Sequence, residues 1–242
     1  MPVSCSSRGR SQIPWFGPNT TLRPPGRGPC ESVSSWPGRT TGIGRHGLAL
    51  SGSSLLVGTI RVSRQVRGSS GAAHGLVTGL GRYRALHVGA KATVEALVED
   101  FDVRCDDGAG VDRELARHAA VEDSVRVEPL AAGAAPIVVG FTTFPGLVLQ
   151  CGRWFVASYP RCGCDACDEG ETDLARTFES TVAAVAAGHF REELRGGLRP
   201  QLTTELWSDR RWSVKQHRAV ARRELKRLGP PATLAWRAWP RR

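Results

Sequence analysis

The sequence LAAGAAPIVVGFTTFPGLVLQCG, residues 130–152, is the longest apolar part of the chain and the key to its architecture. It carries no charged residue over 23 positions, which is long enough to cross a bilayer as a helix. Pro136 and Pro145 interrupt it, however, and its threonines and β-branched residues favour strands. We therefore predict no membrane span but two buried strands, 136–144 and 147–156, joined through Pro145-Gly146 as an antiparallel hairpin.

Alternation along the second strand assigns its residues to two faces. Leu147, Leu149 and Cys151 fall on the same face because side chains repeat every second residue. Cys151 is therefore in line with apolar neighbours. This placement favours a small core residue, although a thiol at this position is also a candidate metal ligand.

Apolar residues at helical spacing predict one helix on each side of this hairpin. The first covers 82–101, with its stripe at Ala90, Val94, Leu97, Val98 and Phe101. The second begins near Thr172 and carries Leu174, Phe178, Val182 and Val185. Gly188 ends or kinks this helix, and residues 189–194 continue the helical turn.

Further strands are predicted at 101–105 and 124–130, and a second hairpin at 201–207 and 211–214. A basic helix over 214–228 and a last strand at 233–236 follow. This order of elements indicates an α+β fold, with a mostly antiparallel sheet and about three helices packed on it. We assign this single domain to residues 79–242.

Residues 1–78 differ in composition from the rest of the chain. Residues 1–75 are rich in Gly, Ser, Pro and Arg, with nine Arg and a single acidic residue, Glu31. They lack a sustained apolar period, so we expect a disordered basic arm preceding the domain. Two origins remain open, a basic arm for nucleic acid and an extension added by a misassigned start codon.

Splitting the chain also changes the meaning of its net charge of +10. Residues 76–204 hold 13 basic and 19 acidic residues, whereas residues 205–242 hold 11 basic and three acidic residues. The body is therefore acidic between two basic ends. The seven cysteines are an odd number, and no secretory signal precedes them, so we expect reduced thiols in the cytoplasm.

The most specific chemical feature is the loop RCGCDACDE, residues 161–169. Cys162, Cys164 and Cys167 form a C-x-C-x-x-C pattern, which can wrap a tetrahedral zinc ion as a structural site. A fourth ligand is needed, and we name Cys151. The other candidates are Cys105, Asp165, Asp168 and His189. A loop of reduced thiols packed on the sheet, without metal, is the alternative.

Two further functions stay open. Cys164 and Cys167 form a C-x-x-C near a helix start, as in a thiol–disulfide oxidoreductase, although the surrounding carboxylates disfavour a thiolate. The basic residues of 214–228, with tryptophans nearby in sequence, could bind nucleic acid, a partner that we favour less than a protein. No catalytic motif is present, so we expect a non-enzymatic interaction module with an unidentified protein partner.

Three blocks of this chain resemble a known family. They are FPGL at 144–147, CGRW at 151–154 and CGCDACDE at 162–169. Together with HFREE at 189–193 and the closing WRAWPRR, the pattern resembles an actinobacterial family of unknown function over residues 80–242. The resemblance implies a bacterial, cytosolic domain, and it assigns no catalytic residues.

Overall fold

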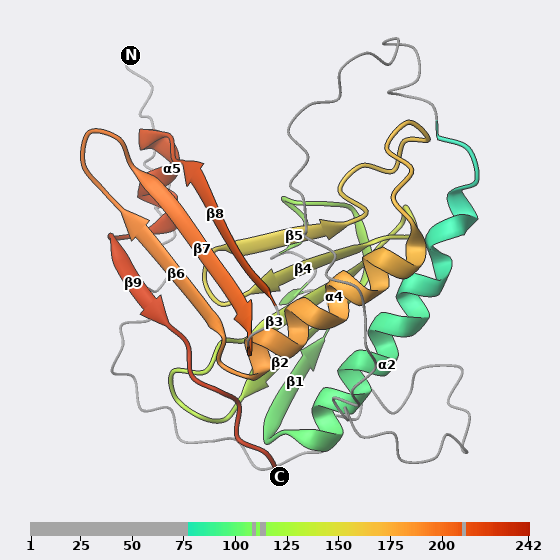
Figure 1. Ribbon diagram of the computed structural model, residues 1–242, viewed down its shortest axis with the longest axis horizontal. Coiled ribbons are helices and arrows are strands. Elements are labelled where there is room, and N and C mark those ends of the chain that lie inside the picture. The colour runs from blue at the N-terminus through green and yellow to red at the C-terminus, as the bar shows by residue number, and fades with distance from the viewer. Residues whose placement is uncertain (1–76, 108–109, 112–114, 210–211) are drawn as a thin grey trace, which may run out of the picture.

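The computed structural model describes residues 77–107, 110–111, 115–209 and 212–242. The arm predicted over 1–78 lies outside these ranges, except for Val77 and Thr78. The described part contains helices and two antiparallel sheets, which confirms the α+β class (Figure 1). The predicted single sheet is therefore two sheets.

The first sheet has five strands in sequence order. They are β1 (Val103–Asp107), β2 (Val121–Pro129), β3 (Ile137–Thr142), β4 (Leu147–Cys151) and β5 (Phe155–Tyr159). β3 and β4 form the predicted antiparallel hairpin, and every residue of both strands is buried. Such burial explains the uncharged stretch, because central strands covered on both faces need apolar residues throughout.

The second strand of this hairpin is shorter than predicted. We expected it to run to residue 156, but it ends at Cys151, and the chain turns back into β5. Gly152 causes this turn, with a φ of 58° that only glycine adopts without strain. Its N–H donates to the Pro136 carbonyl at 2.9 Å.

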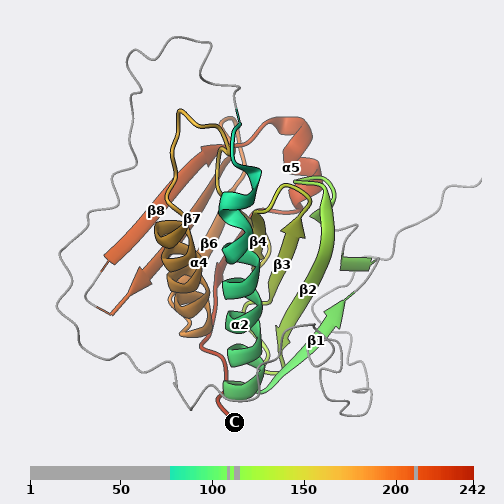
Figure 2. The same cartoon turned by 90° about the vertical axis from the view of Figure 1, so that its right-hand side faces the viewer.

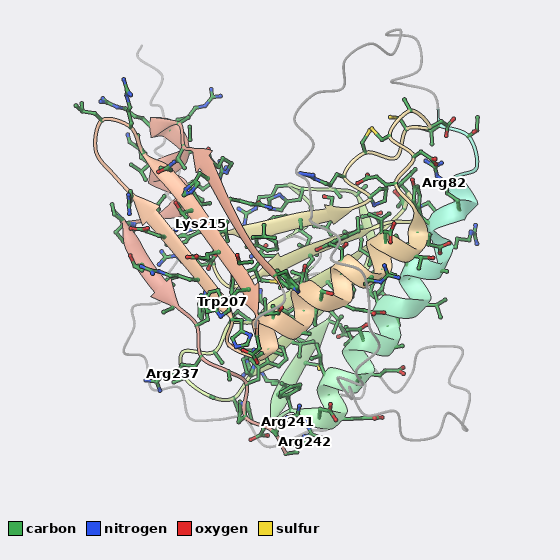
Figure 3. All side chains as sticks on the ribbon, in the orientation of Figure 1. Arg82, Trp207, Lys215, Arg237, Arg241 and Arg242 are labelled. Carbon is green, nitrogen blue, oxygen red and sulfur yellow. The ribbon has the colours of Figure 1, made fainter. Side chains whose placement is uncertain are left out.

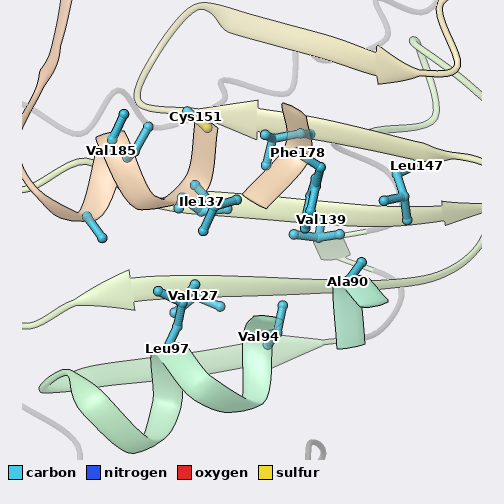
Figure 4. Close-up of a cluster of buried hydrophobic side chains, with 14 of the residues drawn as sticks. Ala90, Val94, Leu97, Val127, Ile137, Val139, Leu147, Cys151, Phe178 and Val185 are labelled. Carbon is cyan, nitrogen blue, oxygen red and sulfur yellow. The ribbon is translucent and has the colours of Figure 1, made fainter. Parts of the chain in front are cut away.

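Two helices cover one face of this sheet. The short 3₁₀ helix η1 (Leu80–Tyr83) leads into α2 (Arg84–Asp100), and α4 (Glu171–Ala186) lies beside α2 (Figure 2). Figure 4 shows the resulting core between the helices and the strands. Its labelled residues are Ala90, Val94, Leu97, Val127, Ile137, Val139, Leu147, Cys151, Phe178 and Val185. Both predicted helical stripes are confirmed.

The second sheet is formed by the C-terminal third of the chain. Its strand order is β8-β7-β6-β9, with β6 (Phe190–Arg195), β7 (Gln201–Ser208), β8 (Trp212–Ala219) and β9 (Ala232–Ala235). Helix α5 (Arg222–Leu228) packs against it through Leu225 and Leu228.

Two predicted helical segments are strands in the structure. Residues 190–195 are β6, since Gly188, with a φ of 76°, ends the helix and the following residues alternate between buried and exposed. Residues 212–219 are β8, which pairs with β7 along its whole length. The predicted basic helix over 214–228 is thus reduced to α5. The cations on which the nucleic-acid hypothesis relied are now divided between a strand and a short helix.

The last seven residues form a strap across the molecule. Trp236 N–H donates to Phe190 at the start of β6, and Trp239 N–H donates to Ala186 at the end of α4. Arg242 N–H then reaches the Asp100 carbonyl at the end of α2. Within the described residues, no helix is both long and apolar enough to span a membrane.

Candidate metal centre

The predicted cysteine loop connects β5 to α4. It begins after Tyr159, the last residue of the edge strand β5, and ends at Gly170, which precedes the first turn of α4. In space it lies near the start of α2. Figure 3 shows the sulfur atoms of this loop close to the labelled Arg82.

The structure brings the three thiols of the loop together. The Sγ atoms of Cys162 and Cys164 lie 3.2 Å apart, and those of Cys164 and Cys167 lie 3.4 Å apart. All three sulfurs lie within 4.8 Å of one another. These separations are too long for disulfide bonds and fit thiols that contact one another through S–H···S hydrogen bonds.

The loop exposes two of these cysteines and buries the third. Cys162 and Cys167 are exposed, whereas Cys164 is 4% exposed. The Cys167 N–H donates to the Cys164 carbonyl at 3.1 Å and closes a turn between them. This arrangement leaves one side of the sulfur cluster accessible from solvent.

Gly163 allows the loop to approach the hairpin closely. A Cβ at this position would lie 2.3 Å from the Phe144 ring, so any side chain would push the loop away. The Phe144 ring also contacts the Tyr83 ring, with centroids 5.8 Å apart. Gly163 therefore allows the backbone between Cys162 and Cys164 to pack directly against the Phe144 ring, which in turn contacts Tyr83.

Asp165 anchors the loop to the segment before α2. Its carboxylate accepts hydrogen bonds from the Thr78 N–H at 3.0 and 2.9 Å and from the Thr78 hydroxyl at 2.8 Å. The backbone N–H of Thr78, followed by its hydroxyl, holds the pKa of Asp165 below its usual value. Arg82 adds an ion pair at 3.8 Å, and its guanidinium donates to the Gly163 carbonyl at 3.3 Å.

The remaining carboxylates of the loop are also engaged. Glu169 accepts the Cys162 N–H at 3.0 Å, and Asp168 lies 3.8 Å from the Arg82 guanidinium. Sequence reasoning did not find Thr78 or Arg82 as partners of the loop. They lie 87 and 81 residues from the groups that they bind, so no local pattern could indicate them.

Proximity of the sulfurs changes the acidity of the cluster. The pKa of Cys167 is raised to about 12, chiefly by its hydrogen bonds with Cys164 and then Cys162. Several thiolates cannot be close together without a cation between them. The same property counts against a reactive thiolate at Cys167, because only the ionised form is a nucleophile.

Cys151 lies in the core rather than in this cluster. It is fully buried on β4, and burial, followed by the nearby Glu192, raises the pKa of its thiol well above the usual value. Leu147 pairs with Tyr159, where the loop begins, and Cys151 is four residues further along β4. At about 3.3 Å per residue, this places Cys151 roughly 13 Å from that end of the strand.

Two further candidates, His189 and Cys105, also lie away from the loop. His189 stacks on Trp207 with centroids 5.7 Å apart and lies 3.4 Å from Asp209, next to the second sheet. Cys105 lies on β1, the edge strand opposite β5. Among the described residues, the cluster of potential metal ligands consists of the three loop cysteines alone.

Comparisons with known proteins give one result. Neither the curated proteins nor the solved structures contain a match to this chain. A protein-family profile, described as a family of unknown function (DUF6226), matches residues 63–242. This match spans both sheets, the helices that pack on them and the cysteine loop. The chain therefore belongs to the family of unknown function DUF6226.

Proposed function

We propose that this chain is a metal-binding, non-enzymatic interaction domain in which Cys162, Cys164 and Cys167 hold a zinc ion. The convergence of three thiols within 4.8 Å carries this proposal. Three thiolates are part of the usual ligand set of zinc, with Zn–S bonds of about 2.3 Å. Cys151 is left out, because it is buried in the core away from the loop.

The surroundings of the loop support a structural role for the ion. Asp165 and Arg82 tie the loop to the start of α2, and the loop itself leads into α4. An ion bound here would stiffen the junction between β5 and both helices. We infer that the stiffened loop is the surface presented to a protein partner.

The proposal also includes a cellular compartment and a group of source organisms. Thiols at 3.2 and 3.4 Å without disulfide bonds suit a reducing compartment, so we place the domain in the bacterial cytoplasm. The resemblance of the FPGL, CGRW and CGCDACDE blocks to an actinobacterial family supports a source in that group.

Zinc content is the direct test. Protein purified without chelator should carry about one equivalent of zinc, and the Cys162→Ser/Cys167→Ser variant should carry less than about a tenth. Both residues are exposed, so the variant should keep its fold. Cys105→Ser removes a cysteine outside the cluster and should retain the metal. A wild-type protein without zinc, even after incubation with it, would refute the zinc assignment.

Thiol–disulfide exchange is the second candidate, favoured by the 3.4 Å between Cys164 and Cys167. The raised pKa of Cys167 argues against it. An insulin-reduction assay decides between the two functions. Activity that disappears in Cys164→Ser, in protein free of metal, would support the oxidoreductase.

A further inference from the structure

Helix α5 presents its cations on one side and its apolar residues on the other. At about 100° per residue, its exposed cations share an arc of about 140°. They are Arg222, Arg223, Lys226 and Arg227. Leu225 and Leu228 lie on the opposite side of the helix, where they pack against the second sheet. The solvent side of α5 is therefore basic.

The acidic residue of α5 does not neutralise this side. Glu224 accepts a hydrogen bond from the Arg218 guanidinium at 2.7 Å, so its charge is already paired with a cation of β8. It lies 3.9 Å from Arg227, a weaker contact. The other three cations of the helix form no ion pair with any described carboxylate.

Tertiary packing places a cation of the first sheet next to the end of α5. The Trp154 indole N–H, which follows the β4–β5 turn, donates to the Leu228 carbonyl at 3.0 Å. A Cβ at Gly229 would lie 2.6 Å from a guanidinium nitrogen of Arg153, so this side chain lies against the helix end. Arg153 is itself exposed.

The β6–β7 turn, residues 196–200, reaches the same end of the molecule. A Cβ at Gly196 would lie 2.9 Å from the Pro231 ring, three residues after the end of α5. The turn carries Arg199, which is exposed. Figure 3 shows side chains that end in nitrogen around α5 and this turn, which Figure 1 places at one end of the second sheet.

A fourth segment comes from the region before β2. Burial, followed by the positive charges of Arg117 and Arg227, lowers the pKa of His118. Arg227 therefore lies near enough to this segment for their charges to act on each other. We call the combined surface the α5 basic patch. Besides the four cations of α5, it contains the exposed residues Arg117, Arg153 and Arg199.

We propose that the α5 basic patch binds the phosphate backbone of double-stranded DNA without regard to base sequence. B-DNA carries one negative charge per about 1.7 Å of helix axis, so a surface that gathers seven cations is complementary to it. Arg and Lys contacts to phosphates position a protein on the duplex but do not read its sequence. This surface lies on the second sheet, whereas the cysteine loop lies near the start of α2 (Figure 1).

The same residues favour duplex DNA over other polyanions. Trp154 is only 7% exposed, so it offers no ring for a base of a single strand to stack on. Leu225 and Leu228 are turned towards the sheet, so α5 has no apolar side to insert into a lipid surface. Arg and Lys provide no acceptor for the ribose 2′-hydroxyl, through which duplex RNA is recognised in part.

Salt-dependent DNA binding by the full chain tests this proposal. Fluorescence anisotropy of a labelled duplex of mixed sequence would be measured at several NaCl concentrations. Arg222→Gln/Arg223→Gln/Lys226→Gln removes the three cations of α5 that have no described acidic partner. We expect the slope of log K against log salt to shrink by about 2.7, because each phosphate contact contributes about 0.9. Affinity at 0.1 M salt should fall on the order of 100-fold.

A matched control separates the patch from net charge. Arg84→Gln/Arg104→Gln/Arg176→Gln removes the same charge from three exposed positions on α2, β1 and α4. It should leave the slope within about 0.5 of the wild type. The basic residues 1–75 are present in both variants and contribute equally. Equal losses in the two variants would overturn the patch as the binding site.

Urea unfolding shows that the patch variant is folded. Its free energy of unfolding should equal or exceed that of the wild type, because neighbouring cations repel one another. Should the triple variant unfold, Lys226→Gln alone should reduce the slope by about 0.9. An unchanged slope in that folded variant would contradict the proposal.

Three further outcomes would overturn the proposal. They are absence of DNA binding by the wild type, tighter binding to phosphatidylserine vesicles than to the duplex, and tighter binding to duplex RNA. The Cys162→Ser/Cys167→Ser variant should bind DNA as the wild type does. Failure of DNA binding would therefore leave the zinc site standing, and absence of zinc would leave the DNA surface standing.

Discussion

Glu192 is the residue that joins the two sheets. It lies on β6 with its carboxylate fully buried. One oxygen accepts the N–H groups of Trp154 and Phe155, both at 2.7 Å. The other accepts the Arg153 N–H at 2.9 Å and the Trp236 indole N–H at 3.0 Å. Burial raises the pKa of Glu192, and these four donors partly offset that effect, so the carboxylate is a saturated structural acceptor.

Replacing Glu192 by glutamine should therefore destabilise the fold. An amide has one acceptor oxygen and one NH₂ group, whereas both carboxylate oxygens of Glu192 accept N–H groups. In either orientation, the glutamine NH₂ would therefore face two N–H donors. We expect a loss of about 3 kcal/mol in the free energy of unfolding, since two buried donors lose their acceptor. Urea unfolding measures this loss.

The neighbouring residue supplies the matched control. Glu193 points to the opposite face of β6, where it pairs with Arg195 at 2.8 Å. Glu193→Gln should change stability by less than about 1 kcal/mol, because surface ion pairs contribute little. Equal losses in the two variants would contradict the bracing role of Glu192.

At the scale of elements, the end of α4 shows why one helix was predicted too long. Residues 191–194 are good helix formers, so their propensity alone favours another helical turn after Gly188. Gly188 adopts a φ of 76°, and the chain then enters β6, between β7 and β9. Tertiary pairing therefore outweighs local propensity here.

Gly188→Ala tests this helix end. A Cβ at Gly188 would lie 2.4 Å from the Ala238 nitrogen in the C-terminal strap, and the positive φ adds strain. Gly197 has a φ of 94° but open space around it, so Gly197→Ala introduces backbone strain without a steric clash. We expect a loss of about 1 kcal/mol for Gly197→Ala and of about 3 kcal/mol for Gly188→Ala in thermal or urea unfolding. Similar losses would show that the strap moves aside freely.

At the scale of the whole molecule, one core connects the two sheets, the helices and the strap. The main cluster of buried side chains includes Leu97 of α2, Phe178 of α4, Leu206 of β7 and Trp239 of the strap. The Trp239 indole N–H donates to the Ala135 carbonyl at 3.0 Å, and its ring meets Phe101 edge-on. We therefore expect the described part to unfold cooperatively.

The two tyrosines of the chain report this cooperativity. Tyr83 and Tyr159 are 1% and 5% exposed, and burial raises the pKa of both, that of Tyr159 to about 12. The unfolded chain ionises near the usual pKa of 10.0, so stability should fall as the pH rises from 10.0 towards about 12. Tyrosinate absorbance should thus appear together with the loss of circular dichroism. Ionisation of both tyrosines in the folded protein near pH 10 would contradict this.

The cysteine spacing and the helical stripes could be predicted because they are local. Cys162, Cys164 and Cys167 must lie close together on any tight loop, and apolar residues at helical spacing must share a face. The β3–β4 hairpin followed in the same way from a short link between two apolar runs. The α+β class was predicted on these grounds, and the two antiparallel sheets with their helices confirm it.

The hairpin of β7 and β8 and the strand β9 were predicted, but β6, most of β8 and the anchors of the loop could not be predicted in this way. β8 is mostly exposed and basic, so its sequence carries neither a helical nor a strand period, and pairing with β7 makes it a strand. Thr78 and Arg82 reach the loop only because the chain folds back over 87 and 81 residues.

The hairpin, the two helical stripes and the proximity of the three thiols follow from the amino-acid sequence, since each depends on residues that are neighbours in the chain. The burial of Cys151 in the core and the partners of the loop carboxylates depend instead on the packing of distant segments. Spacing along the chain can bring together only residues of the same loop, helix or hairpin. A complete set of metal ligands can also include residues from distant segments, and these meet only when the chain packs.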